Sequence, residues 1–109
     1  MSYYHELAHL PEKELVPGIF GKLVHTAGMS ILHARIEKDA VLPEHQHPHE
    51  QITSIISGTL EMTVAGHTKV CHPGEVIAIP SDVPHSARAL TEVQVIDAFQ
   101  PVREDYKAL

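Results

Sequence analysis

The sequence predicts an all-β domain, a sandwich or barrel of short strands, and three observations lead to this prediction. Short β-prone runs, rich in Val, Ile, Leu and Thr, recur at spacings of about ten residues. Gly, Pro and Asp separate these runs, as turn residues do in sandwiches and barrels. The eight Pro fall mostly at run boundaries, where a missing backbone N–H does least harm.

The clearest single strand covers residues 59–64, which alternate polar and apolar side chains at every step. Segment 39–42 is a short extended piece that Pro43 is expected to end, and 80–84 is expected to be a loop. Helix is expected only near the chain ends, with at most a turn or two in residues 4–15, where Pro11 interrupts a weak helical periodicity. In chain order, the predicted strands are residues 19–26, 29–36, 39–42, 52–56, 59–64, 67–70, 76–79 and 93–99.

Length and composition are typical of a small globular protein. The 109 residues fit one hydrophobic core, so a single domain over residues 1–109 is expected. A hydrophobic content of 43% is enough for a packed core. The formal net charge of −6 argues against a nucleic-acid partner, because such a partner requires a clustered basic face.

The sequence also predicts a cytoplasmic protein without a membrane partner. Cys71 is the only Cys, which excludes an intrachain disulfide framework and favours a reducing compartment. The first residues show neither the basic nor the apolar region of a secretory signal. No apolar run approaches the roughly 20 residues that a membrane span requires.

Histidine is unusually frequent, with ten residues against eight Lys and Arg together. His45 and His47 lie two apart in an extended segment, so their side chains project to the same face, as in a strand that chelates a metal. Pro48 breaks the strand, so His49 need not continue that face, whereas His85 follows a Pro-fixed loop and offers a third imidazole. A lone His is usually a surface or packed side chain, and this interpretation applies to the other six, His5, His9, His25, His33, His67 and His72.

Two motifs resemble those of the cupin family. They read Asp39-x5-His45-x-His47-x3-Gln51-x6-Gly58 and Gly74-x5-Pro80-x-Asp82-x2-His85, with residues 59–73 between them. The resemblance implies a small double-stranded β-helix, which is a jelly-roll barrel, with a metal held by His45, His47, Gln51 and His85.

This chain departs from the usual motifs at several positions. Asp39 and Asp82 stand where Gly is usual, and Asp is among the few other residues that tolerate a left-handed backbone. Gln51 replaces the usual Glu ligand. Strand parity leaves open whether Glu50 or Gln51 enters the site, although the motif spacing favours Gln51. A trailing Asn of the second motif is replaced by Ala89.

The expected ligand set has chemical consequences. Three neutral imidazoles and an amide oxygen leave the charge of a divalent ion uncompensated, which attracts an anionic or chelating oxygen ligand. Four protein ligands leave positions open on an octahedral ion, as in a catalytic site. We expect one divalent transition metal ion, with Ni, Zn, Fe and Mn as the candidates.

A second informative run lies near the C-terminus. Asp97 and Phe99 share one face of the last predicted strand. An Asp inside a barrel is costly unless it meets a cation, a hydrogen-bond donor or a substrate. The alternatives are a salt bridge from Asp97 to a structural Arg, a core position for Phe99 and a surface charge for Arg103.

The run Asp97-x-Phe99-x-Pro101-x-Arg103-Glu104-Asp105-Tyr106 resembles the C-terminus of small pectin-degradation cupins of the KdgF type. The resemblance implies conversion of 4,5-unsaturated uronate monomers, released from pectin or alginate, to open-chain 5-keto-4-deoxyuronate. It also implies a pocket beside the metal lined by Asp97, Phe99 and Arg103. We expect Asp97 to act as a proton shuttle, Arg103 to clamp the carboxylate of this small anionic sugar, and Phe99 to form an apolar wall.

Two other functions stay open at this point. Cupins with three His include iron- and nickel-dependent dioxygenases, although these usually carry Glu at the position of Gln51. A metal-dependent ligand-binding or sensor cupin without enzymatic activity is the other alternative, because one barrel hosts many functions. A homodimer is expected, by resemblance and because residues 3–10 are apolar enough to bind a partner.

Overall fold

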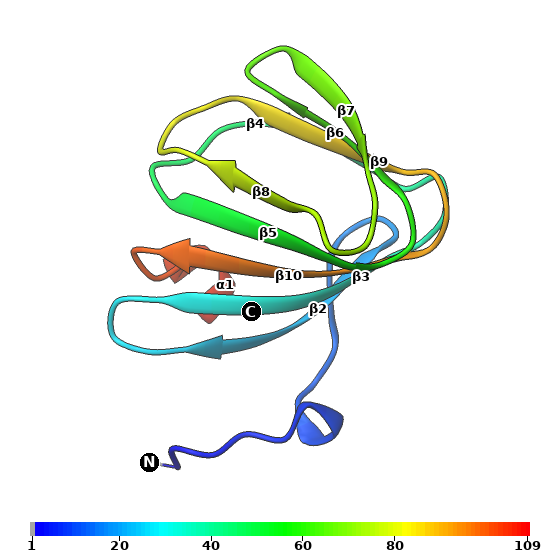
Figure 1. Cartoon of the computed structure of the whole chain (residues 1–109). Coiled ribbons are helices and arrows are strands. Elements are labelled where there is room, and N and C mark those ends of the chain that lie inside the picture. Colours follow the sequence, from blue (N-terminus) through cyan, green and yellow to red (C-terminus); the bar gives the residue numbers. More distant parts are fainter. Residues whose placement is uncertain (1) are drawn as a thin grey trace.

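The computed structural model describes residues 2–109, so Met1, the first residue of the predicted domain, lies outside the described residues. Two antiparallel sheets face each other (Figure 1), one of six strands in the order β1-β2-β3-β10-β5-β8 and one of four in the order β4-β9-β6-β7. The predicted all-β jelly-roll barrel is confirmed. The elements are η1 (Leu7–His9), β1 (Lys13–Val16), β2 (Ile19–His25), β3 (Ser30–Ile36), β4 (Val41–His45), β5 (Glu50–Ser57), β6 (Leu60–Val64), β7 (His67–Cys71), β8 (Val76–Ile79), β9 (His85–Ala89), β10 (Val93–Gln100) and α1 (Glu104–Lys107).

The core lies between the two sheets and follows from the two-residue period of the strands. Every second side chain of β3, from Ser30 to Ile36, is buried, and Val93, Val95 and Phe99 of β10 lie on the same inner face. Leu60, on β6 of the opposite sheet, also lies in this core. The alternation therefore assigns one face of each sheet to the interior.

Strand β10 lies between β3 and β5, and its register with β5 positions four inner-face side chains. Asp97 is opposite Thr53, and Phe99 is opposite Gln51. Directly opposite residues on one face of an antiparallel pair lie close enough for their side chains to touch. The register thus brings the Gln51–Thr53 stretch alongside the predicted Asp97–Phe99 pair.

The sheet of β4 and β9 differs from the sequence prediction at both strands. The extended piece predicted at 39–42 is a strand only from Val41, since Asp39 lies in a left-handed turn, and the strand continues through Pro43 to His45. It can do so because β4 is an edge strand, where the missing N–H of Pro43 removes no necessary ladder bond. Strand β9 was not predicted, since it begins at His85 directly after the expected loop 80–84 and is rich in small residues. Its pairing with β4 places His45 opposite His85.

The chain ends also differ from the prediction. Within residues 4–15 only η1 is helical, and Lys13–Val16 forms β1 instead, because its backbone pairs with the neighbouring β2. The short helix α1 after β10 was not predicted. Among the described residues, no helix combines the length and the hydropathy that a bilayer span requires.

The two Asp residues that replace motif glycines adopt the backbone predicted for them. Asp39 has φ 70° and Asp82 has φ 61°, both in the left-handed region. Asp populates this region more readily than most residues because its short polar side chain can bond the local backbone. The substitutions therefore keep the turns of the motifs.

The predicted homodimer stays a prediction. Tyr3 and Tyr4 are 87% and 88% exposed, which leaves their rings without cover from the barrel. Large apolar side chains are also exposed on the outer face of the six-stranded sheet, among them Ile31, Ile52 and Val76.

Substitution of two turn glycines would show how closely the connections between strands are packed. Gly58 and Gly66 both have left-handed φ values, 82° and 80°. A Cβ atom added to Gly58 would clash with the Glu92 carbonyl oxygen. Within residues 2–109, a Cβ atom added to Gly66 would meet no atom within 4 Å. Gly66→Ala is expected to cost about 1 kcal/mol of unfolding free energy. Gly58→Ala is expected to cost at least about 2 kcal/mol more. Urea unfolding measures both, and equal losses would contradict the backbone contact as the cause.

Candidate metal centre and adjoining cavity

His45, His47 and His85 converge at one end of the barrel. Their nearest ring nitrogens all lie within 4.8 Å of one another. The three come from the end of β4, the β4–β5 connection and the start of β9, and His85 is almost fully buried, at 1% exposure. Three imidazoles in one such cluster form a donor set suited to a divalent transition metal.

Backbone carbonyl groups fix the orientation of all three rings. The Nδ1 atoms of His45, His47 and His85 lie 2.9, 3.0 and 2.9 Å from the carbonyl oxygens of Pro43, His49 and Val83 respectively. A carbonyl oxygen only accepts, so each Nδ1 carries the hydrogen and donates it. Each Nε2 then has a free lone pair, which is the arrangement of metal-ligating histidines.

The hydrogen bonding of the three histidines is consistent with a bound metal ion. The Nε2 atom of His85 is buried and has no hydrogen-bond partner among residues 2–109, which is costly for a polar atom unless a cation accepts its lone pair. Burial lowers the pKa of His85, and burial together with the nearby Arg103 charge lowers the pKa of His47. Both rings are therefore held neutral, which is the form that binds a metal.

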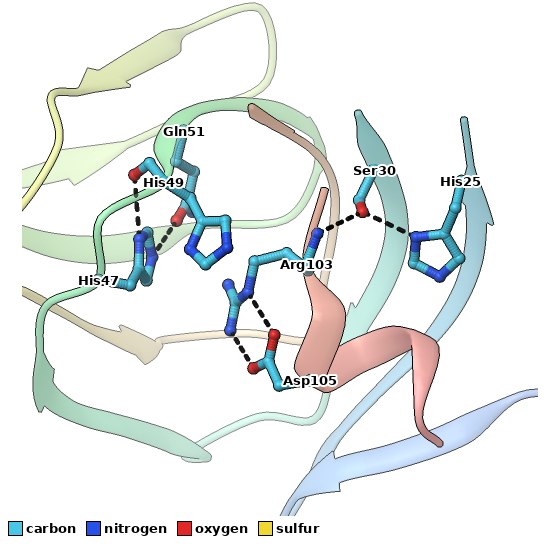
Figure 2. Close-up of polar contacts among 7 residues, drawn as sticks. All are labelled: His25, Ser30, His47, His49, Gln51, Arg103 and Asp105. Carbon is cyan, nitrogen blue, oxygen red and sulfur yellow. Dashed lines mark hydrogen bonds and ion pairs between the residues drawn. The ribbon is translucent and has the colours of Figure 1, made fainter. Parts of the chain in front are cut away.

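Gln51 lies beside this cluster, whereas Glu50 points to the outer face of the sheet. Gln51 is 7% exposed, and its Oε1 lies 3.1 Å from Nε2 of His47 (Figure 2). With the His47 hydrogen on Nδ1, both facing atoms are acceptors, and such a contact is unfavourable unless a cation binds both. Of the two residues that strand parity left open, Gln51 is thus the one placed for a metal.

His49 lies at the edge of the cluster and is not part of it. Its carbonyl oxygen accepts the hydrogen bond from His47, and its ring lies 5.4 Å from the His47 ring, centroid to centroid. The sequence left the place of His49 open, since after Pro48 it need not continue the face of His45 and His47; in the structure it lies outside the three-His cluster.

A chain of hydrogen bonds connects Gln51 to Asp97. Gln51 Nε2 donates to Thr53 Oγ1 at 2.9 Å, and Thr53 Oγ1 donates to Asp97 Oδ1 at 2.6 Å. Burial raises the pKa of Asp97 from 3.8 to about 6, against the opposing effects of the Thr53 and Gln51 hydrogen bonds and the Arg103 charge. The alternative of a structural ion pair for Asp97 does not match the geometry, because Arg103 pairs with Asp105.

Arg103 is an interior side chain and not a surface charge, since its side chain is 10% exposed. Its Nε and Nη2 donate to the two carboxylate oxygens of Asp105, at 3.0 and 2.8 Å (Figure 2). The guanidinium carbon lies 3.9 Å from the Tyr106 ring centroid and 4.7 Å from that of Phe99. The backbone N–H of Arg103 donates to the buried Ser30 hydroxyl at 2.8 Å. These contacts fix both the position and the plane of the guanidinium.

Asp97 is among the residues that line a cavity of about 290 Å³. Its wall is mostly aliphatic, and its polar lining comes from Asp97, Asp105 and Tyr106. The three histidines do not line it. Asp97 therefore lines the cavity and is also connected to Gln51 through Thr53. The aliphatic wall is a physical reason for its raised pKa.

Three residues of this arrangement were not predicted as functional. Thr53 lies two residues after Gln51 in the same strand, so the sequence indicates that both side chains lie on one face. It does not indicate the hydrogen bonds that Thr53 makes. Asp105 and Tyr106 lie in the matched C-terminal run, yet the unpredicted helix α1 decides that they contact Arg103. Pairwise contacts of this kind depend on tertiary packing, so a sequence pattern alone does not give them.

Comparisons with known proteins agree with this architecture. The family model described as a cupin domain matches residues 32–99. The pectin degradation protein KdgF of Dickeya dadantii strain 3937 is 27% identical over 99 residues, which cover 88% of this chain and 90% of that protein.

Two solved structures are also similar. The structure of KdgF from Halomonas sp. has a TM-score of 0.88 at 30% identity, covering 97% of this chain and 98% of that one. An RmlC-like cupin from Shewanella frigidimarina has a TM-score of 0.92 at 23% identity, covering 97% and 96%, and this likeness concerns the fold.

The raised pKa of Asp97 predicts a pH-dependent cost to stability in the metal-free protein. The folded state favours the protonated Asp97 carboxyl. The contribution of this carboxyl to the unfolding free energy is therefore fully present below pH 3.8 and is lost as the pH rises through about 6. The loss amounts to at most about 3 kcal/mol. Asp97→Asn removes the charge, so the variant is expected to exceed the wild type in unfolding free energy at about pH 7.5 and to match it at about pH 4. Urea unfolding at both pH values measures this, and a variant less stable at both would contradict burial as the dominant cause.

Proposed function

Because the chain belongs to the cupin family, we propose that it is a metal-dependent enzyme that converts 4,5-unsaturated uronate monomers to open-chain 5-keto-4-deoxyuronate. One observation carries the proposal: Asp97, with a pKa raised to about 6, lines an interior cavity and is linked by hydrogen bonds through Thr53 to Gln51, beside the three-His centre. The similarity to two KdgF proteins, one of them named for pectin degradation, supports uronates as the substrate class.

His45, His47, His85 and the Gln51 oxygen would hold one divalent transition metal ion, with Ni, Zn, Fe and Mn as candidates. When bound, such an ion polarises and orients substrate oxygens without changing its oxidation state. Because these four donors are neutral, the centre keeps a positive charge that favours an anionic substrate.

The reaction is an isomerisation in which atoms and electrons balance. The substrate is a cyclic enol ether that is also a hemiacetal. Loss of the proton from the anomeric hydroxyl forms the C1 carbonyl as the bond from C1 to the ring oxygen breaks, and the electron pair of that bond goes to the ring oxygen. The resulting C5 enolate takes a proton at C4 and becomes the ketone. One proton leaves O1 and one arrives at C4, so no oxidant or reductant is needed.

Asp97 is the group that would move these protons. Thr53 occupies its Oδ1, which leaves Oδ2 as the oxygen that would take up and release a proton. A pKa of about 6 allows both steps near neutral pH, and general acid–base catalysis of this kind contributes about 10² to 10⁴ in rate.

Arg103 and Phe99 would bind and enclose the substrate. Asp105 holds Nε and Nη2 of Arg103, so the other edge of the guanidinium remains for the substrate carboxylate. This charge already lowers the pKa of His47 and His85, although less than burial does, so its field reaches the metal centre. The Phe99 ring lies 5.9 Å from that of His47 and forms an apolar wall, which strengthens the nearby electrostatic interactions by excluding water.

The proposal predicts metal-dependent turnover of an unsaturated uronate. With unsaturated galacturonate, the absorbance of the 4,5-double bond is expected to fall in the presence of enzyme, to persist after chelator treatment, and to fall again when Ni²⁺, Zn²⁺, Fe²⁺ or Mn²⁺ is restored. An unchanged absorbance under all these conditions would sink the proposal. Oxygen uptake with Fe²⁺ would support the dioxygenase alternative, and binding without turnover would support a sensor.

The role of Asp97 predicts a large loss of activity for Asp97→Asn. The variant is expected to lose about 10² to 10⁴ in kcat while still binding metal, because it lacks the proton-carrying carboxyl. Asp39→Asn is the matched control, since the Asp39 side chain is 65% exposed and Asn tolerates its left-handed backbone. Full turnover in Asp97→Asn would exclude it as the proton shuttle.

A further inference from the structure

The Thr53 hydroxyl contacts both the Gln51 amide beside the three-His centre and the Asp97 carboxylate. Thr53 is 2% exposed on the inner face of β5, opposite Asp97 in the ladder to β10. We propose that Thr53 is a positioning residue: its hydroxyl fixes the orientation of the Gln51 amide, so that the oxygen and not the NH₂ group faces the three-His centre.

The orientation follows from counting hydrogens. The Asp97 carboxylate only accepts, so the single hydroxyl hydrogen of Thr53 is used at the 2.6 Å contact with Asp97 Oδ1. Toward Gln51 the hydroxyl oxygen can then only accept. The atom of Gln51 that lies 2.9 Å away must therefore be its donor, Nε2.

This choice decides what Gln51 presents to the histidines. With Nε2 directed to Thr53, Oε1 is directed to the other side, 3.1 Å from Nε2 of His47. An amide oxygen has lone pairs for a cation, whereas the NH₂ group has only hydrogens to offer. The two ends of an amide are nearly equal in size and shape, so packing alone discriminates weakly between the two orientations.

The same contact couples the two halves of the site. One hydroxyl holds the amide beside the metal centre and one oxygen of the carboxylate beside the cavity. The inference rests on the metal centre and the Gln51 ligand of the proposed function, but not on the uronate reaction. Metal affinity therefore tests it even if the substrate is a different molecule.

Thr53→Val removes the hydroxyl at nearly constant shape. Loss of an outer-shell partner that orients a ligand typically costs 10- to 100-fold in metal affinity, and we expect a loss of about that size for Zn²⁺. Thr53→Ser restores the hydroxyl and is expected to stay within about threefold of the wild type. Thr63→Val is the matched control, because the Thr63 hydroxyl on β6 contacts only Thr68, at 2.7 Å. Competition between each protein and a chromogenic chelator, with Zn²⁺ alone, measures the affinities.

Repeating Thr53→Val in a protein that also carries Gln51→Glu distinguishes an effect on the orientation of residue 51 from an effect on packing. In Gln51→Glu the side chain ends in two equivalent oxygens, so its presentation to a metal no longer depends on which way it turns. Thr53→Val is therefore expected to lose several-fold less affinity in this background than in the wild type. Equal losses in both backgrounds would indicate a packing effect and would overturn the proposal, as would an unchanged affinity in Thr53→Val.

If Thr53→Val does not fold, the wild-type protein supplies the test. Hydrogen exchange of the side-chain amides, followed by NMR in the zinc-loaded protein, is expected to be slower for Gln51 than for the exposed Gln94 and Gln100. Thr53→Ser is expected to retain this protection. Exchange of Gln51 as fast as that of the exposed residues would show that its NH₂ is not held by Thr53 and would overturn the proposal.

Discussion

The pairing of β10 with β5 is the constraint on which the site depends. Its register places Asp97 opposite Thr53 and Phe99 opposite Gln51, all on the inner face. A slip of β10 by one residue would turn Asp97 and Phe99 outward and replace them with Ile96 and Ala98. Because Val93, Val95 and Phe99 of β10 are buried in the core, such a slip would also move these three side chains out of it. The burial that stabilises the fold therefore also specifies the position of the polar chain.

Charge around the site differs from charge on the whole molecule. The protein has a formal net charge of −6, yet the donors of the metal centre are neutral and Arg103 lies beside them. Asp105 contacts the guanidinium from one edge and holds it by two hydrogen bonds, while its own side chain is 59% exposed and can stay hydrated. This partner limits the cost of a buried cation without placing a second charge between Arg103 and the histidines. A local positive field in an acidic protein thus follows from which charges are buried, and net charge does not predict it.

Sequence patterns predicted most of the strands because alternation and turn residues are local properties. The left-handed turns at Asp39 and Asp82 were likewise predictable, since so few residue types tolerate that backbone. Strand β9 and helix α1 were missed because neither carries an amphipathic signal of its own. Their short segments are stabilised by neighbours distant in sequence, such as β4 and β6 for β9.

The convergence of His45, His47 and His85 was predictable from motif spacing, whereas the contacts that orient them were not. The carbonyl groups of Pro43, His49 and Val83 fix the rings, and every residue has a carbonyl, so no residue type marks these partners. The roles of Asp97, Phe99 and Arg103 stay predictions. What the structure adds is that Arg103 lies against the Phe99 and Tyr106 rings and that Thr53 donates a hydrogen bond to Asp97.

The cost of Asp97 to the stability of the fold is an argument that this residue serves the chemistry of the site. A carboxyl whose pKa is raised to about 6 by burial makes folding less favourable at neutral pH than a neutral side chain would. The surrounding cavity adds to this cost, because its aliphatic wall lacks the contacts of a filled core. The register would accommodate an apolar residue opposite Thr53, and the cost of the buried charge would then not arise. A position where the chain keeps a destabilising charge next to an open volume and a set of metal donors is where chemistry, and not folding, explains the residue.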